Sequence, residues 1–214
     1  MVMNCVFQQE YRENERKGGE YVDEDREDVI LETEHLCYSY DRKKIALQDV
    51  NLSVRKGERI AVLGSNGAGK STCFLNLNGV LVPDSGKIMY RGTEIMKKNR
   101  NELRKHVGIV FQEADNQIIA STVAAEVSFG PMNLKLPVAE VKRRVDEALE
   151  CMNLMEMKDR PPHYLSGGEK KRVCIADIVA MDSELFLFDE PTASLDPLNA
   201  AIFEEVLDKL WTMG

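Results

Sequence analysis

The chain has 214 residues, a formal net charge of −8 and 43% hydrophobic residues. Its length suits one large α/β domain or two small ones, and its apolar fraction is sufficient for a buried core. The negative charge argues against a general nucleic-acid binder. The sequence has neither an apolar run long enough to span a membrane nor the basic-then-apolar start of a secretory signal. We therefore expect a globular protein that reaches a membrane only through a partner.

Residues 1–28 carry most of the negative charge. They contain nine acidic and four basic side chains and few apolar ones, so they account for about five of the excess negative charges. A segment of this composition cannot bury enough apolar surface to offset the loss of chain entropy on folding. We therefore expect residues 1–28 to form a disordered acidic tail.

The first half of the chain after this tail is rich in predicted strands. Residues 30–40 and 46–54 contain many β-forming side chains and flank a polar turn, which predicts two antiparallel strands. A third strand is predicted at 59–63, followed by a glycine-rich loop and a helix that Gly79 is placed to end. Another strand is predicted at 85–93.

The second half changes from strands to helices. A compact apolar strand is predicted at 107–111, and residues 122–181 are mostly helical, with apolar side chains repeating on one face. Residues 184–188 return to strand, and 197–211 form an amphipathic helix for which Asp196 is the predicted N-cap. A β-rich start, a parallel core, a helical insertion and a return to the core together predict an α/β fold.

Residues 64–72 read GSNGAGKST and follow an apolar strand. In this G-x-x-x-x-G-K-[ST] spacing, glycines allow backbone N–H groups to converge on phosphate oxygens at the start of a helix. We expect Lys70 to reach the β- and γ-phosphates of a nucleotide and the Ser71 hydroxyl to bind Mg²⁺. The alternative is a glycine-rich turn that only caps a core helix, which the flanking strand disfavours. The predicted phosphate-binding residues are Gly64, Ser65, Asn66, Gly67, Ala68, Gly69, Lys70, Ser71 and Thr72.

Two carboxylates follow the apolar strand at 184–188. Ligands of open α/β sheets bind at the carboxyl ends of strands, so Asp189 is expected to hold Mg²⁺ and Glu190 to orient or deprotonate the attacking water. Adjacent side chains on a strand point to opposite faces, so the two carboxylates cannot share one role. The alternative is a strand that merely ends in the polar turn Asp-Glu-Pro-Thr.

Residues 165–169 read LSGGE and open a helix. The spacing S-x-x-E is that of a capping box, in which Ser166 satisfies an N–H of the first turn and Glu169 reaches back. Capping does not explain the two glycines, which lower helix propensity but leave N–H groups that a second phosphate could approach. The chain therefore contains two predicted anion sites.

Three segments taken together resemble the ATPase subunit of an ATP-binding cassette (ABC) transporter. They are GSNGAGKST, LSGGEKKR and LFLFDEPTASLD, and Gln112 closes the strand before the helical insertion. The resemblance covers residues 30–214. It implies a P-loop NTPase of the ABC ATPase type, an α/β fold with a mixed or parallel core sheet. The implied ATPase domain is 29–214, with an N-terminal antiparallel β subdomain and an inserted helical subdomain at about 113–181.

The resemblance also implies a shared nucleotide site and ATP and Mg²⁺ as ligands. In that family two cassettes dimerise head to tail, and ATP is clamped between the phosphate loop of one and the LSGG segment of the other. This accounts for both predicted anion sites. The roles implied for individual residues are γ-phosphate binding on the partner for Ser166 and Gly168, with Gly167 between them among the ATP-binding residues. Tyr40 is implied to stack on adenine, Gln112 to sense Mg²⁺ and water, and Asp196 to make contact across the dimer. With Glu190 and Lys70, Gln112 forms the expected catalytic set.

Two further segments resemble the ATPases of energy-coupling-factor importers, particularly those of the cobalt and nickel type. Residues 110–118 read VFQEADNQI and residues 128–134 read SFGPMNL. In the family this region receives the transmembrane subunits. The resemblance implies a peripheral ATPase on the cytoplasmic face of the cell membrane. Its implied partners are a second ATPase subunit, identical or not, a transmembrane scaffold subunit and a substrate-binding membrane subunit, with no nucleic acid.

Other functions remain open at this point. One is the ATPase of a different ABC importer or exporter, and another is a soluble cassette that acts on DNA or the ribosome. The short separation of Lys70 and Ser166 disfavours the DNA-repair type, which carries a long insertion there. A third is a nucleotide-binding module without turnover. The cargo, whether cobalt, nickel or another micronutrient, cannot be read from this chain because selectivity in such importers belongs to a separate subunit.

The chain departs from the family pattern at its end. Family members carry a switch histidine after the catalytic glutamate, at the end of a further core strand. None of His35, His106 and His163 stands at that position. We therefore expect the 214 residues to be a fragment of a longer chain that lacks part of its C-terminus, and we expect little hydrolysis by this piece alone.

Overall fold

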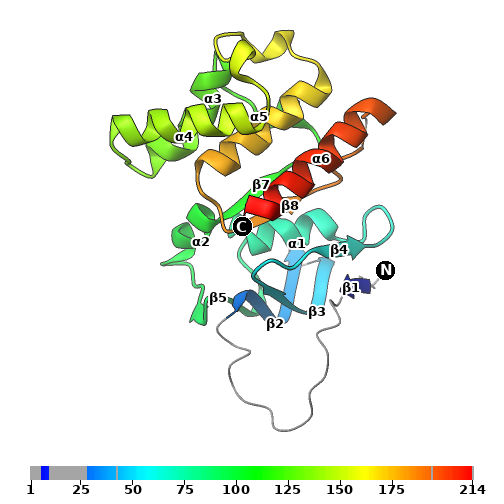
Figure 1. Ribbon diagram of the computed structural model, residues 1–214. Coiled ribbons are helices and arrows are strands. Elements are labelled where there is room, and N and C mark those ends of the chain that lie inside the picture. Colours follow the sequence, from blue (N-terminus) through cyan, green and yellow to red (C-terminus); the bar gives the residue numbers. More distant parts are fainter. Residues whose placement is uncertain (1–5, 10–27, 42, 194, 214) are drawn as a thin grey trace, which may run out of the picture. The chain divides into compact units, whose positions relative to one another are not determined.

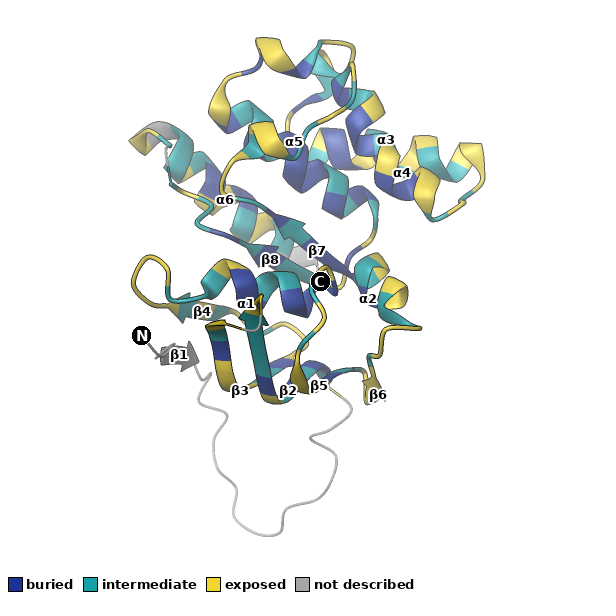
Figure 2. Ribbon diagram, turned by 180° about the vertical axis from the view of Figure 1, so that it is seen from behind, coloured by how far each residue is buried: buried dark blue, intermediate teal, exposed yellow. Residues whose placement is uncertain are grey.

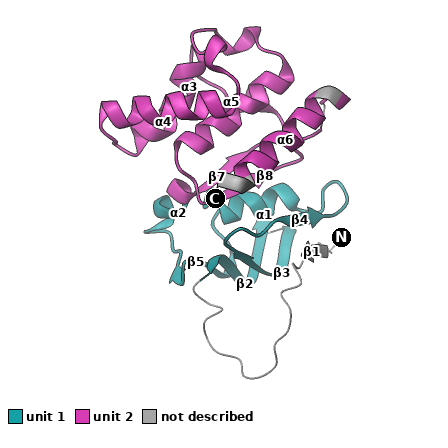
Figure 3. Ribbon diagram, in the orientation of Figure 1, with its two compact units in different colours: residues 1–103 teal, residues 104–214 magenta. Residues whose placement is uncertain are grey.

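The computed structural model describes residues 6–9, 28–41, 43–193 and 195–213. They form two compact units, residues 1–103 and 104–214 (Figure 3), which are considered separately. The boundary falls within a short helix, α2 (Arg100–His106). Figure 1 labels the helices and strands. The fold class predicted from the sequence is confirmed, since an antiparallel N-terminal sheet, a parallel strand pair and several helices are all present.

The first unit contains a four-stranded antiparallel sheet. Its two long strands, β2 (Val29–Tyr40) and β3 (Lys44–Arg55), pair as the sequence predicts. On the other side of β2 lies β5 (Ser85–Tyr90), and β6 (Thr93–Glu94) pairs with β5 at the edge. Both strands bury apolar side chains on the core, but the register shifts in their pairing break strict alternation. The buried residues are Ile30, Leu31, Thr33 and Leu36 of β2 and Leu47, Val50 and Val54 of β3.

The strand predicted at 85–93 is broken into a hairpin. Arg91 and Gly92 both adopt positive φ angles, 45° and 71°, between the paired residues Tyr90 and Thr93. Two consecutive residues of positive φ form the tight turn whose twist matches that of antiparallel strands. The single predicted strand was therefore wrong at its C-terminal end, because Arg-Gly is a turn rather than a continuation.

Residues Val6–Gln9 form a short strand, β1, in the segment that the sequence predicts to be a disordered tail. β1 pairs antiparallel with β4 (Ile60–Leu63), with Val6 opposite Leu63. The prediction was wrong for these four residues, because charged side chains begin only at Glu10 and the preceding stretch contains the β-forming pair Val-Phe. Residues 1–5 and 10–27 of the predicted tail lie outside the described residues.

The helix α1 (Lys70–Leu77) follows β4 and ends as predicted. Asn78 is its C-cap, and Gly79, with φ of 74°, donates its N–H to the Asn76 carbonyl at 2.9 Å. A left-handed glycine after the last turn is a common way to end a helix. The core of this unit consists of apolar side chains that are almost completely buried (Figure 2), among them Leu31, Leu36, Leu47, Leu77 and Ile88.

The second unit has a parallel strand pair. In it β7 (Val107–Val110) lies beside β8 (Leu185–Phe188), with Val107 opposite Leu185 and Val110 opposite Phe188. The long separation of these two strands in the sequence is filled by helices, as parallel pairing requires. The chain then continues into α6 (Pro197–Met213). The predicted strands at 107–111 and 184–188 are thus confirmed and pair with each other.

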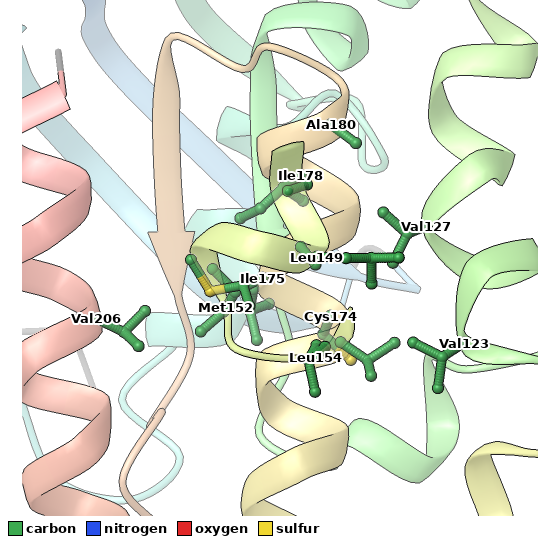
Figure 4. Packing of buried hydrophobic residues seen from close by; sticks show 14 of the residues in the cluster. Val123, Val127, Leu149, Met152, Leu154, Cys174, Ile175, Ile178, Ala180 and Val206 are labelled. Atoms are coloured by element: carbon green, nitrogen blue, oxygen red, sulfur yellow. The ribbon is translucent and has the colours of Figure 1, made fainter. Parts of the chain in front are cut away.

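Three α-helices and three short 3-10 helices, η2 (Ala114–Asn116), η3 (Met155–Met157) and η4 (Pro162–Tyr164), fill the interval between β7 and β8. The α-helices are α3 (Val123–Asn133), α4 (Val138–Cys151) and α5 (Gly167–Ala180). Their apolar faces form one buried cluster, and Figure 4 shows Met152 of the α4 C-cap beside Ile175 of α5 and Leu149 of α4 near Ile178. Within the described residues, no helix combines the length and the apolar character needed to cross a bilayer.

Candidate nucleotide site

The phosphate loop lies between β4 and α1 in the first unit. Gly67 and Gly69 adopt left-handed φ angles of 79° and 98°, and the Ala68 N–H donates to the Ser65 carbonyl at 3.0 Å. A Cβ atom at Gly67 would meet no atom within 4 Å, so the loop is open on that side. The positive φ angles explain why glycine occurs at both positions, since other residues rarely adopt them.

Lys70 is the first residue of α1, and its ammonium lies against the loop. Nζ donates to the Gly64 carbonyl at 2.9 Å and to the Ser65 carbonyl at 3.3 Å. The next residue, Ser71, is exposed. An exposed glycine loop, a helix N-terminus and a lysine held beside them form a set of donors that fits a triphosphate. The left-handed glycines and the position of Lys70 agree with the motif, while phosphate binding by residues 64–72 stays a prediction.

Tyr40 at the end of β2 is linked to the same loop. Its hydroxyl lies 3.1 Å from Oγ1 of Thr72, and its ring packs edge to face against Tyr38 with centroids 5.1 Å apart. The side chain is 40% exposed. The structure thus brings Tyr40 to the helix that carries the phosphate loop, while adenine stacking itself stays a prediction.

Gln112 follows β7 in the second unit and is exposed. Its main-chain carbonyl accepts a hydrogen bond from Nζ of Lys171 at 2.6 Å. The side chain of Gln117 fixes the same segment, because its Oε1 accepts from the Phe111 N–H at 3.1 Å and its Nε2 donates to the Ile109 carbonyl at 3.2 Å. The side chains of Lys171 and Gln117 therefore fix the main chain around Gln112, while the side chain of Gln112 itself is exposed.

Asp189 and Glu190 come directly after β8. Asp189 is 7% exposed, and its N–H donates to the Val110 carbonyl at 3.0 Å, which extends the strand pairing by one bond. Glu190 has a φ angle of 45°. Such a conformation costs about 1 kcal/mol or more for a residue with a side chain, and it occurs often at functional sites. Because β8 ends at Phe188, the alternation of side chains along a strand does not extend to Asp189 and Glu190. The direction of the Glu190 side chain is set by its left-handed backbone conformation instead.

The predicted capping box at the start of α5 is confirmed. The Ser166 hydroxyl accepts from the Glu169 N–H at 3.3 Å, and the Glu169 carboxylate accepts from the Ser166 N–H at 2.7 Å. This bond to the Ser166 N–H lowers the pKa of Glu169. Ser166 and Gly167 are exposed, and a Cβ atom at Gly167 would meet nothing within 4 Å.

Gly168 differs from Gly167 because it is buried. The side chain of Asn199, at the start of α6, covers it so closely that a Cβ atom at Gly168 would collide with Oδ1 of Asn199. Asn199 is in turn fixed by Asp196, whose Oδ1 accepts from the Asn199 N–H at 3.0 Å and whose Oδ2 accepts from Nδ2 at 2.6 Å. Asp196 is thus the N-cap of α6, as predicted, with both carboxylate oxygens engaged.

Sequence reasoning missed two residues that hold these motifs in place. Lys171 is buried and bonds the main chain of Gln112, and Asn199 joins Asp196 to Gly168. A lysine in a charged run ordinarily faces solvent, and an asparagine in the first turn of a helix usually serves only that helix. Neither residue type signals a contact with a distant segment.

Comparison with known proteins gives a consistent result. The family model described as "ABC transporter" matches residues 47–193. A putative ABC transporter ATP-binding protein of Methanosarcina acetivorans is 50% identical over 85% of this chain and 56% of its own length. The energy-coupling factor transporter ATP-binding protein EcfA of Methanococcus maripaludis is 47% identical over 87% of this chain and 68% of its own length. The chain therefore spans about half to two thirds of these relatives.

A solved structure is also similar. It is that of cbiO1 from Clostridium perfringens, described as part of the ABC transporter complex cbiONQ. The TM-score is 0.77 at 41% sequence identity, and the match covers 87% of this chain and 75% of that one.

Proposed function

The chain belongs to the ABC transporter family, and from this we propose that it is the ATP-binding and ATP-hydrolysing subunit of an importer of the energy-coupling-factor type. The observation that carries the proposal is the open glycine loop at 64–72, with Lys70 held at the start of α1. The similarity to the EcfA and cbiO1 proteins supports the importer type. The remaining site residues then receive the roles that the family resemblance implies.

We assign the binding of ATP to residues 64–72 and Tyr40, and γ-phosphate binding on a second subunit to Ser166, Gly167 and Gly168. Ser71, Gln112 and Asp189 are proposed to hold Mg²⁺, which when bound neutralises charge on the phosphates. Their oxygen donors suit this cation. Glu190 is the proposed base, which orients and deprotonates the attacking water, and Asp196 is proposed to face the second subunit.

The proposed partners are a second ABC ATPase subunit, a transmembrane scaffold subunit and a substrate-binding membrane subunit. Exposed apolar side chains after Gln112 support the membrane partners. Ile119 is 73% exposed, and Phe129 and Met132 on α3 are 52% and 63% exposed. The N–H groups of Ile119 and Ala120 donate to the Glu126 carboxylate of α3 at 2.9 and 2.7 Å, which fixes the segment against that helix. Such a surface suits docking to an apolar helix.

With these partners the subunit would act at the cytoplasmic face of the cell membrane, as a peripheral protein. We propose a transition-metal cation, cobalt or nickel, or another micronutrient as the cargo, carried by the membrane subunits. Residues 29–214 would be the ATPase domain and about 113–181 its helical subdomain. Opening and closing of the ATPase dimer would then drive the membrane subunits.

The proposal is tested by Glu190→Gln in the full-length protein. We expect the variant to bind ATP as the wild type does and to stop releasing phosphate, because the amide cannot accept the proton of the attacking water. Glu205→Gln on the exposed face of α6 is the control and should hydrolyse ATP normally. Unchanged phosphate release by Glu190→Gln would contradict the assigned base. A wild type that binds ATP without releasing phosphate would favour the non-hydrolysing alternative.

A further inference from the structure

Lys171 is a buried lysine that bonds two consecutive main-chain carbonyls. The residue is 3% exposed, and its Nζ donates to the Gln112 carbonyl at 2.6 Å and to the Phe111 carbonyl at 3.1 Å. Both acceptors belong to the first residues after β7. The bonds therefore join α5, which begins with the LSGG segment, to the main chain of Gln112.

A cation is a costly choice for this position. Burial lowers the pKa of Lys171, while Cys174, Glu113 and Asp189 nearby act to raise it. An isolated buried ammonium costs several kcal/mol, and an apolar side chain of similar volume is often equally or more stable. Stability of the fold alone therefore does not explain why this position is a lysine. The two main-chain carbonyls that its ammonium bonds suggest a role instead.

The other end of the link is the first turn of α5. Ser166 and Glu169 close this turn through the capping box, and Asn199 packs on Gly168. Lys171 stands in the second turn of the same continuous helix, so its stem moves with the first turn. A displacement of the Ser166 end consequently displaces Nζ and the carbonyl that it holds.

The neighbouring Lys170 makes a different contact. Its Nζ lies 2.6 Å from Oδ1 of Asp115, whose side chain is 71% exposed. The Lys170 side chain is 16% exposed, so solvent screens this ion pair mainly from the carboxylate side, and we expect its contribution to be small. The two adjacent lysines thus reach the same segment, one through a buried bond to the main chain of Gln112 and the other through a surface carboxylate.

We propose that Lys171 is a positioning residue for ATP hydrolysis, which couples the LSGG end of α5 to Gln112 through the main-chain carbonyl of Gln112. The inference rests on the proposed function, since it gives Lys171 a role only if Gln112 takes part in hydrolysis. Binding of a phosphate at Ser166 would fix the first turn of α5, and the Lys171 bond would fix Gln112 in consequence. In this proposal Lys171 acts only through the Gln112 carbonyl and is assigned no contact with substrate or metal.

The test measures kcat and KM for ATP in the full-length protein, per molecule that binds a non-hydrolysable ATP analogue. We expect Lys171→Met to lower kcat about ten-fold or more, because small displacements of positioned groups slow chemistry strongly. KM should stay within about two-fold, because residues 64–72 are untouched. Lys171→Arg keeps two donors for the carbonyls and should recover at least half of the wild-type kcat.

Lys170→Met is the matched control, since it removes the adjacent ammonium and leaves the Gln112 bond; its kcat should stay within about two-fold of the wild type. A kcat of Lys171→Met within the same range, or an equal loss in Lys171→Arg and Lys171→Met, would overturn the proposal. If instead the wild type binds ATP without hydrolysis, the proposed function fails first, and the two failures are distinguishable.

If Lys171→Met does not fold, the proposal is tested with Lys171→Gln, for which amide hydrogen exchange is measured together with kcat. The shorter amide can reach at most one of the two carbonyls, so amide exchange at 109–117 should rise while exchange at 141–149 in α4 stays unchanged. A lower kcat together with this local rise supports the link. Unchanged exchange at 109–117 in the folded glutamine variant would overturn it.

Discussion

Asn199 covers Gly168 so closely that no side chain fits between α5 and the start of α6 at this point. A Cβ atom at Gly167, one residue earlier, would meet nothing within 4 Å. Glycine therefore occurs at the two positions of the LSGG segment for different structural reasons. Gly168 is required by packing against Asn199, whereas Gly167 is left exposed beside the Ser166 cap, where a ligand can approach it.

This difference predicts opposite effects of alanine at the two glycines. Alanine is favoured over glycine within a helix by about 1 kcal/mol, so Gly167→Ala should leave the free energy of unfolding unchanged or raise it. At Gly168 the collision with Asn199 outweighs that gain, and we expect Gly168→Ala to lower the free energy of unfolding by about 1–3 kcal/mol. Urea unfolding of the full-length variants measures both.

The origin of the Gly168 effect is checked by adding Asn199→Ala. Removing the asparagine side chain should restore most of the stability lost in Gly168→Ala, because the two residues are in contact and their effects are not additive. The single variant Asn199→Ala measures the reference loss. Strictly additive effects would mean that Asn199 is not what excludes a side chain at Gly168.

The capping role of Asp196 and its proposed contact with the second subunit can be separated by substitution. As the N-cap of α6 it can be replaced by asparagine, which caps helices equally well, but not by alanine, which should cost about 1 kcal/mol of stability. Asp196→Asn keeps the cap bond through its amide oxygen but loses the bond from Nδ2 of Asn199, so its free energy of unfolding should fall less than that of Asp196→Ala. If it nevertheless weakens ATP-dependent dimerisation in analytical ultracentrifugation, the charge acts on the second subunit. Equal destabilisation by both variants would contradict the capping role.

Local spacing determined which parts of the site were predictable. The Ser166–Glu169 capping box and the Gly79 helix end depend on residues within one helical turn, and both are found in the structure. The Lys171 bonds join residues that are 60 and 59 positions apart, so they cannot be predicted from the spacing of residues in a single sequence. A lysine in a charged helix is expected to be exposed, and only the fold brings its ammonium to the carbonyls of the two residues that follow β7.

The errors of prediction have equally local causes. At Arg91 and Gly92 a pair of left-handed residues ends β5, although the surrounding composition favours strand. At Val6–Gln9 the average composition of the tail concealed a short uncharged stretch that pairs with β4. In both cases the average composition of a longer segment concealed two to four residues whose own backbone preferences determine the local structure.

The final prediction concerns Asp177 in α5, a largely buried carboxyl group near Glu126 of α3. Burial, and secondly the Glu126 carboxylate, raise the pKa of Asp177 from 3.8 to about 7, while the Gly130 amide lowers it. The folded state thus holds a proton that the unfolded state loses at lower pH. Stability from this group is fully present below pH 4 and is lost as the pH rises through 7.

Asp177→Asn should remove this loss, because the amide stays neutral at every pH in the range. Between pH 5 and pH 8 the wild type should lose about 2–3 kcal/mol of unfolding free energy that the variant keeps. Urea unfolding of the full-length proteins at the two pH values measures the difference, with Asp182→Asn, an exposed carboxylate, as control. The same pH dependence in Asp177→Asn and the wild type would show that another group holds the proton, since no other change separates the two proteins.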